Sequence, residues 1–109
     1  TLDQRYDDAI ALSDADKPDE AVAALEEILR EDPSHALAHT ALSVLYGRLD
    51  RHHDAVHHAE EVCRLEPDDP LSYISKSIVC RKAGDNTGAE EAMALAMRKQ
   101  WESASPKKN

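Results

Sequence analysis

The sequence predicts an all-α protein built as a solenoid, in which one helix–turn–helix unit is copied three times and stacked. The first observation is a constant interval of 34 residues, at which Ala21, Ala55 and Ala89 recur. Pro33 and Pro67 keep the same interval. A fixed period of about 20 to 50 residues is typical of repeat architectures. The second observation is that no stretch of alternating, β-branched residues is long enough to compete as a strand.

Further positions repeat in the same phase, and most of them carry small or apolar side chains. They are Leu12, Tyr46 and Cys80, together with Ala9, Ser43 and Ser77. Small residues allow paired helices to approach closely, because the distance between helix axes depends on the side chains at the contact. We therefore expect repeats at about 2–35, 36–69 and 70–103, which form a single domain over residues 1–101.

In the first repeat, helices are expected at about 2–14 and 18–31. Pro18 suits the first turn of the second helix, because the N–H that proline lacks would have no partner there. The segment 32–34, with Pro33 at its centre, is expected to be a loop, since the residue before a proline is disfavoured in the helical region.

In the second repeat, helices are expected at about 35–48 and 52–65, and Pro67 and Pro70 mark the loop that follows. In the third repeat they are expected at about 70–83 and 87–101. Gly84 opens a turn into the last helix, which is expected to begin with a polar cap. Residues 102–109 contain Ser, Pro and Lys and are expected to form a flexible tail.

The order of residues within the period resembles the tetratricopeptide repeat (TPR), whose pattern is W-x2-L-G-x2-Y…A-x3-F…P. The second repeat matches it best, with Leu42, Ser43, Tyr46, Ala55, Ala59 and Pro67. The first repeat departs from it, since Arg5 and Asp8 stand where the family prefers Trp and Leu. The third has Lys76 at the Leu position and Trp101 in place of Pro. The resemblance implies six antiparallel helices in a right-handed superhelix that serves as a protein-interaction module.

In TPR arrays the first helix of each pair lines a concave groove, so the resemblance also implies a binding face. Its residues would be Tyr6, Ile10, Leu37, Val44, Arg48, Leu71, Ile74, Ile78, Arg81 and Lys82. They form an apolar strip with an acidic margin at one end and the three basic residues at the other. Contiguous exposed apolar area usually marks an interaction site. We therefore expect a scaffold or adaptor that binds an apolar peptide or helix.

One activity of the family is excluded. TPR co-chaperones hold the C-terminal carboxylate of a chaperone with a clamp of Lys, Asn, Asn, Lys and Arg. The matching positions here are Tyr6, Ile10, Ala41, Leu71 and Ser75. None of these side chains offers the charged donors that a two-carboxylate ligand requires.

Two other occupants of the apolar surfaces stay open. The sequence begins at Thr1 without Met, so we expect it to be part of a longer protein, another segment of which could fill the groove. Alternatively the chain forms a homodimer through its last helix. The run 92–97 is apolar on more than one face, and such a helix is normally buried on both sides.

The charge distribution limits the class of partner. The net charge is −9, and residues 1–34 alone carry −8 whereas residues 69–109 carry +2. Nucleic-acid binding is disfavoured, because neutralising phosphates requires clustered Lys and Arg. No apolar run is long enough to span a membrane. Cys63 and Cys80 are expected to be buried thiols rather than a disulfide, which indicates a cytoplasmic protein.

The histidines are the only cluster that could carry chemistry. His53 and His57 are four residues apart on one predicted helix, so they could share a metal ion, but a metal site needs three or four converging ligands. We expect the histidines at 52, 53, 57 and 58 to be surface residues and His39 to pack between helices. No cofactor is implied. No phosphate-binding loop or nucleophile motif is present, so we expect no enzymatic activity.

Overall fold

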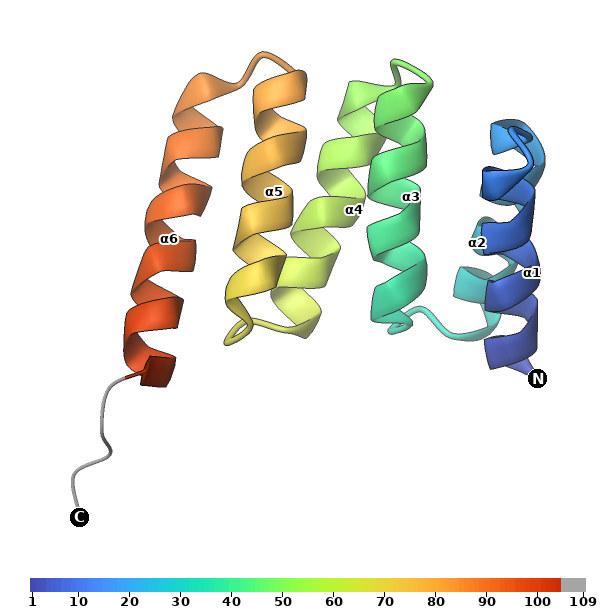
Figure 1. Cartoon of the computed structure of the whole chain (residues 1–109), viewed down its shortest axis with the longest axis horizontal. Coiled ribbons are helices and arrows are strands. Elements are labelled where there is room, and N and C mark those ends of the chain that lie inside the picture. Colours follow the sequence, from blue (N-terminus) through green and yellow to red (C-terminus); the bar gives the residue numbers. More distant parts are fainter. Residues whose placement is uncertain (105–109) are drawn as a thin grey trace.

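The computed structural model describes residues 1–104 and arranges them in six α-helices (Figure 1). They are α1 (Leu2–Asp14), α2 (Pro18–Glu31), α3 (Ala36–Arg48), α4 (His52–Leu65), α5 (Pro70–Lys82) and α6 (Asn86–Ala104). The all-α fold predicted from the sequence is confirmed, and each expected helix boundary but the last agrees within one residue.

The last boundary was wrong. Helix α6 continues through Glu102 to Ala104, three residues into the expected tail. No helix breaker follows Trp101 before Pro106, and Ser105, which precedes that proline, is the first residue with a backbone bias against helix. The rest of the expected tail, residues 105–109, lies outside the described part of the chain.

The turn inside each repeat has the same backbone geometry. Asp16, Asp50 and Gly84, which are 34 residues apart, have φ values of 60°, 60° and 85°. The residue after each of them donates its N–H to a carbonyl in the last turn of the helix, at 2.8 to 2.9 Å. These bonds define the Schellman ending, in which a left-handed residue reverses the chain and satisfies the free carbonyls. The 34-residue period is therefore a period of backbone conformation.

A second periodic contact joins successive repeats. His39 Nε2 lies 2.9 Å from the carbonyl oxygen of Pro33, and the Tyr73 hydroxyl donates to the carbonyl oxygen of Pro67 at 2.7 Å. Both pairs are six residues apart, and His39 and Tyr73 occupy equivalent positions. A ring with a polar hydrogen at this position thus fixes the loops before the second and third repeats.

The core consists of small and aliphatic side chains, as the composition requires in a chain without Phe. The in-phase residues Ala9, Ala21, Ala55 and Ala89 are all within 1% of full burial. They allow the helix pairs to approach closely. Larger side chains fill the space between α2 and α3, chiefly Leu25, Ile28, Leu42 and Leu45, and join the first two repeats in one cluster.

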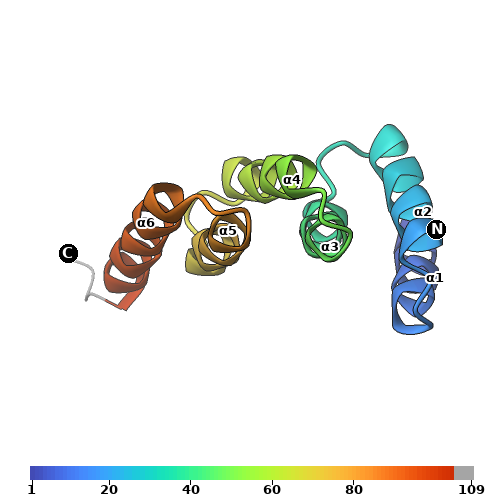
Figure 2. The ribbon, with the colours of Figure 1, turned by 90° about the horizontal axis from the view of Figure 1, so that it is seen from above.

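The helix array is curved. In Figure 2, α3 and α5 lie on one side and α4 on the other, and both ends of the array reach toward the side of α3 and α5. That side is therefore the concave one, as expected from the resemblance, and it faces the viewer in Figure 1. The right-handed sense of the superhelix stays an expectation. Within residues 1–104, no helix is long and apolar enough to cross a membrane.

Candidate functional site

The concave side carries most of the large apolar side chains that the fold leaves exposed. Six such residues are exposed within residues 1–104, and four belong to the predicted groove. Leu37 and Leu71 are 60% and 65% exposed, and Val44 and Ile78 are 54% and 47% exposed. Each pair occupies equivalent positions on α3 and α5, so the two helices present a repeated pattern of apolar side chains.

Two pockets lie between α3 and α5. The larger, about 320 Å³, is lined by Ala36, Leu37, Thr40, Val62, Glu66, Asp69, Leu71, Ser72 and Ser75. The smaller, about 100 Å³, is lined by Thr40, Ser43, Val44, Ser75, Ile78, Val79 and Lys82. Because Thr40 and Ser75 line both pockets, the two are adjacent and follow each other along the helices. We call the two pockets together the α3–α5 groove.

The first repeat contributes less to this surface than the sequence predicts. Tyr6 and Ile10 on α1 are half-buried, and neither lines a pocket of the α3–α5 groove. The Tyr6 ring packs against the core and lies 5.7 Å from the His35 ring. Burial, with a smaller contribution from Asp7, raises the pKa of the Tyr6 hydroxyl. Ile74 on α5 is also half-buried, so the exposed strip is shorter than the predicted one.

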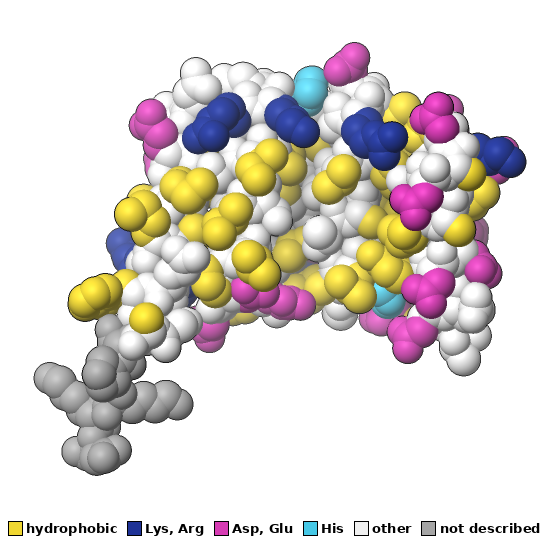
Figure 3. All heavy atoms as spheres, viewed as in Figure 1, with side chains coloured by type: hydrophobic (Ala, Val, Ile, Leu, Met, Phe, Trp, Pro, Cys, Tyr) yellow, Lys and Arg dark blue, Asp and Glu magenta, His cyan; other side chains and the backbone are white. Residues whose placement is uncertain are grey.

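Charge is separated along the groove. Arg48, Arg81 and Lys82 lie in the last turns of α3 and α5, and Lys82 also lines the smaller pocket. Glu66 and Asp69 line the larger pocket at the opposite end. Figure 3 shows basic side chains in a row along the upper edge of this face, and acidic ones over the first repeat and along the lower edge. The groove is thus apolar in the middle and oppositely charged at its ends.

The two predicted metal-ligand candidates lie on the other helix of the second repeat. His53 and His57 line a separate pocket of about 370 Å³, together with His52, Val56, Glu60 and Ala83. Within residues 1–104, no group of three or more His, Cys, Asp or Glu side chains is placed to hold a metal ion. Two imidazoles alone do not complete the three or four protein ligands of a zinc site.

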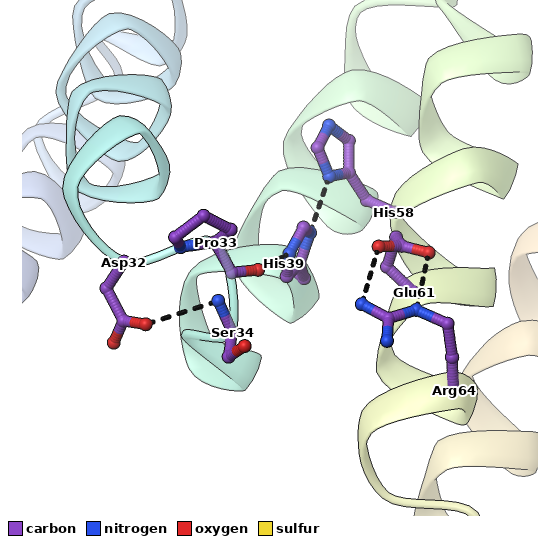
Figure 4. Close-up of polar contacts among 7 residues, drawn as sticks. All are labelled: Asp32, Pro33, Ser34, His39, His58, Glu61 and Arg64. Carbon is purple, nitrogen blue, oxygen red and sulfur yellow. Dashed lines mark hydrogen bonds and ion pairs between the residues drawn. The ribbon is translucent and has the colours of Figure 1, made fainter.

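The expectation that all four histidines of α4 are surface residues was wrong for His58. Its ring is 8% exposed, because the turn of α4 that carries it faces α3 rather than solvent. It stacks on the Tyr46 ring, with centroids 5.6 Å apart, and contacts His39, which is buried between helices as predicted. Figure 4 shows the His39 and His58 rings pointing toward each other from α3 and α4.

The two cysteines are not activated for chemistry in this fold. Cys63 and Cys80 are free thiols, and Cys80 is buried while Cys63 is half-buried. Burial raises the pKa of both thiols, so neither is activated as a thiolate nucleophile. The Cys63 Sγ instead contacts the carbonyl oxygen of Ser72 at 3.4 Å, where it packs α4 against α5.

The family assignment rests on the sequence match together with this fold. The pattern of the family described as "Tetratricopeptide repeat" matches residues 6–70, which is more than half of the chain. The chain belongs to the tetratricopeptide-repeat family. No curated protein sequence matches it significantly. TPR modules are typically scaffolds for protein–protein interaction, and the family is usually non-catalytic.

Solved structures support the TPR fold of the whole array. The chain is similar to "Crystal structure of MamA", with a TM-score of 0.86 and 20% identity over 95% of this chain and 61% of that one. A second structure, "Crystal structure of MamA protein", gives a TM-score of 0.88 at 19% identity, over 100% and 60%. The "CopN-Scc3 complex" gives 0.83 at 14% identity, over 90% and 58%. This TPR chain therefore spans about three fifths of the solved chains that it matches.

Some features of the TPR groove were missed in the sequence. An acidic margin at one end of the groove was predicted, but the part of Glu66 and Asp69 in it was not, because these residues lie in a loop that comes to the groove only when α5 packs beside α3. Glu26 was also missed, although it approaches both Tyr46 and His58 from α2. The only sequence signal for this role of Glu26 was its position on α2 close to the buried residues Leu25 and Ile28.

Proposed function

We propose that this TPR chain is a protein-interaction module that binds an apolar peptide or helix in the α3–α5 groove. One observation carries the proposal. Leu37, Val44, Leu71 and Ile78 are apolar and about half or more exposed, and they line two adjacent pockets. A soluble protein seldom leaves contiguous apolar area open unless another molecule covers it.

The groove also has the character that a peptide site requires. Its centre offers hydroxyl groups, because Thr40 and Ser75 line both pockets between the apolar side chains. The Thr40 hydroxyl already donates to the Ala36 carbonyl, so its oxygen lone pairs remain to accept a bond. Apolar anchors then supply affinity, and the few polar groups orient the ligand.

The test is selection from a library of random 16-residue peptides displayed on phage, followed by binding of the selected peptides to variants. The double variant Val44→Asp/Ile78→Asp places two charges in the smaller pocket without disturbing the core, since both side chains are exposed. We expect it to lose the selected peptides while its circular dichroism stays helical. The matched control is Ala23→Asp, at an exposed position on α2 outside both pockets.

Peptides that bind wild type and the double variant equally would overturn the groove proposal. A wild-type chain that selects no peptides at all would do the same, and would favour a groove covered by another segment of the same protein. Ile10, another predicted groove residue, is half-buried, so a charge placed there would affect folding as well as binding.

A second candidate function has a separate observation in its favour. Met97 and Trp101 on α6 are 63% and 74% exposed, and they are the other two exposed large apolar side chains within residues 1–104. Self-association of two copies through α6 would cover both side chains.

A further inference from the structure

The basic residues at the upper end of the α3–α5 groove differ from most other basic residues in the chain. Arg5, Arg30, Arg51, Arg64, Lys76 and Lys99 each form an ion pair with a carboxylate. Within residues 1–104, Arg48, Arg81 and Lys82 have no such pair. Arg48 makes one long contact, 3.4 Å from its Nη1 to the Ser13 hydroxyl oxygen. The groove end thus carries three cations that form no ion pair within residues 1–104, in a strongly acidic chain.

The three cations are placed by the repeat itself. Arg48 and Lys82 are equivalent residues 34 apart, each in the last turn of the helix that carries the apolar anchors. Lys82 lines the same pocket as Val44 and Ile78. A ligand that fills this pocket therefore has its next residues beside positive charge. Charges beside a binding pocket orient a partner of complementary charge and disfavour partners of like charge.

We propose that the partner is a protein segment with two apolar anchors followed or preceded by acidic residues, whose carboxylates lie against Arg48, Arg81 and Lys82. This inference rests on the proposed function and adds the chemistry of the ligand and the end of the groove at which its acidic residues lie. The apolar side chains occupy the Leu37–Leu71 and Val44–Ile78 positions. The acidic end of the groove, at Glu66 and Asp69, excludes the reverse orientation by like-charge repulsion.

The helix geometry sets the spacing within the ligand. Leu37 and Val44 are seven residues apart on α3, which is about 10 Å at the rise of an α-helix. Seven residues of a ligand helix span the same distance and place both anchors on one face. Three residues of polyproline II, at about 3.1 Å each, come to about 9 Å. Arg48 is one further turn along, so the first carboxylate lies about 6 Å beyond the second anchor.

A purely structural role for the cations is the competing explanation. Lys and Arg in the last turn of a helix interact favourably with its macrodipole. That role predicts that their removal lowers thermal stability and leaves the ligand preference unchanged. The two explanations therefore differ in one measurable property, which is the dependence of affinity on ligand charge.

The probes are three labelled peptides that share the apolar core of one selected peptide and end in three Glu, three Gln or three Lys residues. Their dissociation constants for the chain are measured by fluorescence anisotropy. We expect the Glu peptide to bind about tenfold more tightly than the Gln peptide, since each exposed ion pair contributes a factor of roughly two to five. We expect the Lys peptide to bind most weakly. Raising the ionic strength from about 0.01 to about 0.15 M, which shortens the Debye length from about 30 to about 8 Å, should reduce the difference.

Three variants separate the effect of the three cations at the groove end from the effect of the total charge. Arg48→Glu/Arg81→Glu/Lys82→Glu should reverse the order of the three peptides. Lys17→Glu/Arg98→Glu changes two exposed cations that likewise form no ion pair within residues 1–104 but lie outside the last turns of α3 and α5, and it should leave the order unchanged. A neutral variant, Arg48→Gln/Arg81→Gln/Lys82→Gln, should abolish the Glu preference and tests the three cations without adding repulsion between acidic residues.

The outcomes distinguish this inference from the proposed function. Equal affinity for the three peptides, lost in Val44→Asp/Ile78→Asp, would overturn the acidic flank and leave the apolar groove standing. A Glu preference that persists in the neutral variant would also overturn it. Peptide binding that is insensitive to the groove variant would overturn both.

Discussion

The Nδ1 atoms of His39 and His58 lie 2.9 Å apart in the interior of the second repeat. Each neutral imidazole carries one proton, so the pair brings two protons to three contacts. The His39 Nε2 contact with the Pro33 carbonyl, at 2.9 Å, requires a proton, because a carbonyl oxygen only accepts. The second proton lies between the rings, on His58 Nδ1. The bare His58 Nε2 then faces Glu26 Oε1 at 3.4 Å, the longest of the three contacts.

The buried, neutral state of His58 makes the stability of the fold depend on pH. Burial, the largest cause, lowers the pKa of His58, and the neighbouring His39 and His57 lower it further against the opposing effect of Glu26 and Asp54. Tyr46, also packed against this ring, donates its hydroxyl to the same Glu26 oxygen. The folded-state pKa is thus below the unfolded value of about 6.5. His58 contributes stability that is complete above pH of about 6.5 and is lost as the pH falls from there through the folded pKa.

The measurement is the free energy of unfolding by urea at several pH values from about 7 to about 5. We expect a decrease attributable to His58 with a slope of at most about 1.4 kcal/mol per pH unit. The control is His58→Gln, which keeps a donor for His39 but does not titrate. A wild-type curve parallel to that of the variant over this range would contradict the neutral pair.

Replacement of glycine by alanine should have opposite effects on stability at Gly84, in a turn, and at Gly47, in a helix. Gly84→Ala should destabilise the fold by about 1 kcal/mol, because Gly84 has φ +85° and a side chain there is strained. Gly47→Ala should stabilise it by about 0.5 to 1 kcal/mol, since Gly47 lies within α3. A Cβ would meet no atom within 4 Å at either position, so only the backbone conformation separates them. Thermal unfolding of both variants checks this, and two shifts of equal sign would contradict it.

Substitution of a buried and of an exposed leucine should separate the effects on stability from the effects on binding. Leu42 is fully buried and Leu71 is 65% exposed in the groove. Leu42→Ala should cost about 2 to 5 kcal/mol of unfolding free energy through the cavity it leaves. Leu71→Ala should change stability by less than about 0.5 kcal/mol but weaken the selected peptides several-fold. Denaturant titrations and anisotropy on both proteins provide the check. A Leu71→Ala protein with unchanged affinity would remove Leu71 from the site.

Self-association through α6 predicts a concentration-dependent mass. If two copies pair there, light scattering should approach twice 12.1 kDa at high concentration. Met97→Asp should restore the monomer, because it places a charge in the covered surface. Ala23→Asp, on α2, is the matched control. A monomeric wild type at all concentrations rules this candidate out.

The repeat phase made most of the fold predictable. Pro33 and Pro67 located the loops between repeats, and the alanines at 21, 55 and 89 located the close helix contacts. The turn at Gly84 was predictable from its residue type, whereas Asp16 and Asp50 share its left-handed conformation only because they share its phase. The residue types that form turns and loops act on their near neighbours in the chain, and their repetition every 34 residues can be read directly from the sequence.

The groove was only partly predictable. Four apolar positions on α3 and α5 that the family pattern indicates are exposed, namely Leu37, Val44, Leu71 and Ile78, whereas Ile74 is half-buried. The half-burial of Tyr6 and Ile10 was not predictable, since it depends on how the first repeat packs against the second. The burial of His58 depends in the same way on the rotation of α4 against α3. The relative orientation of two helices depends on side chains from distant parts of the sequence.

The sequence by itself determined the number of repeats, the positions of the helices and turns, and which helices carry the apolar anchors. Only the tertiary structure decided that Thr40 and Ser75 lie in one groove, that Glu66 and Asp69 close one end of it, and that Arg48, Arg81 and Lys82 lack acidic partners within residues 1–104. The physical reason is that helix and turn formation is local, whereas pockets and ion pairs exist only after helices far apart in sequence have packed.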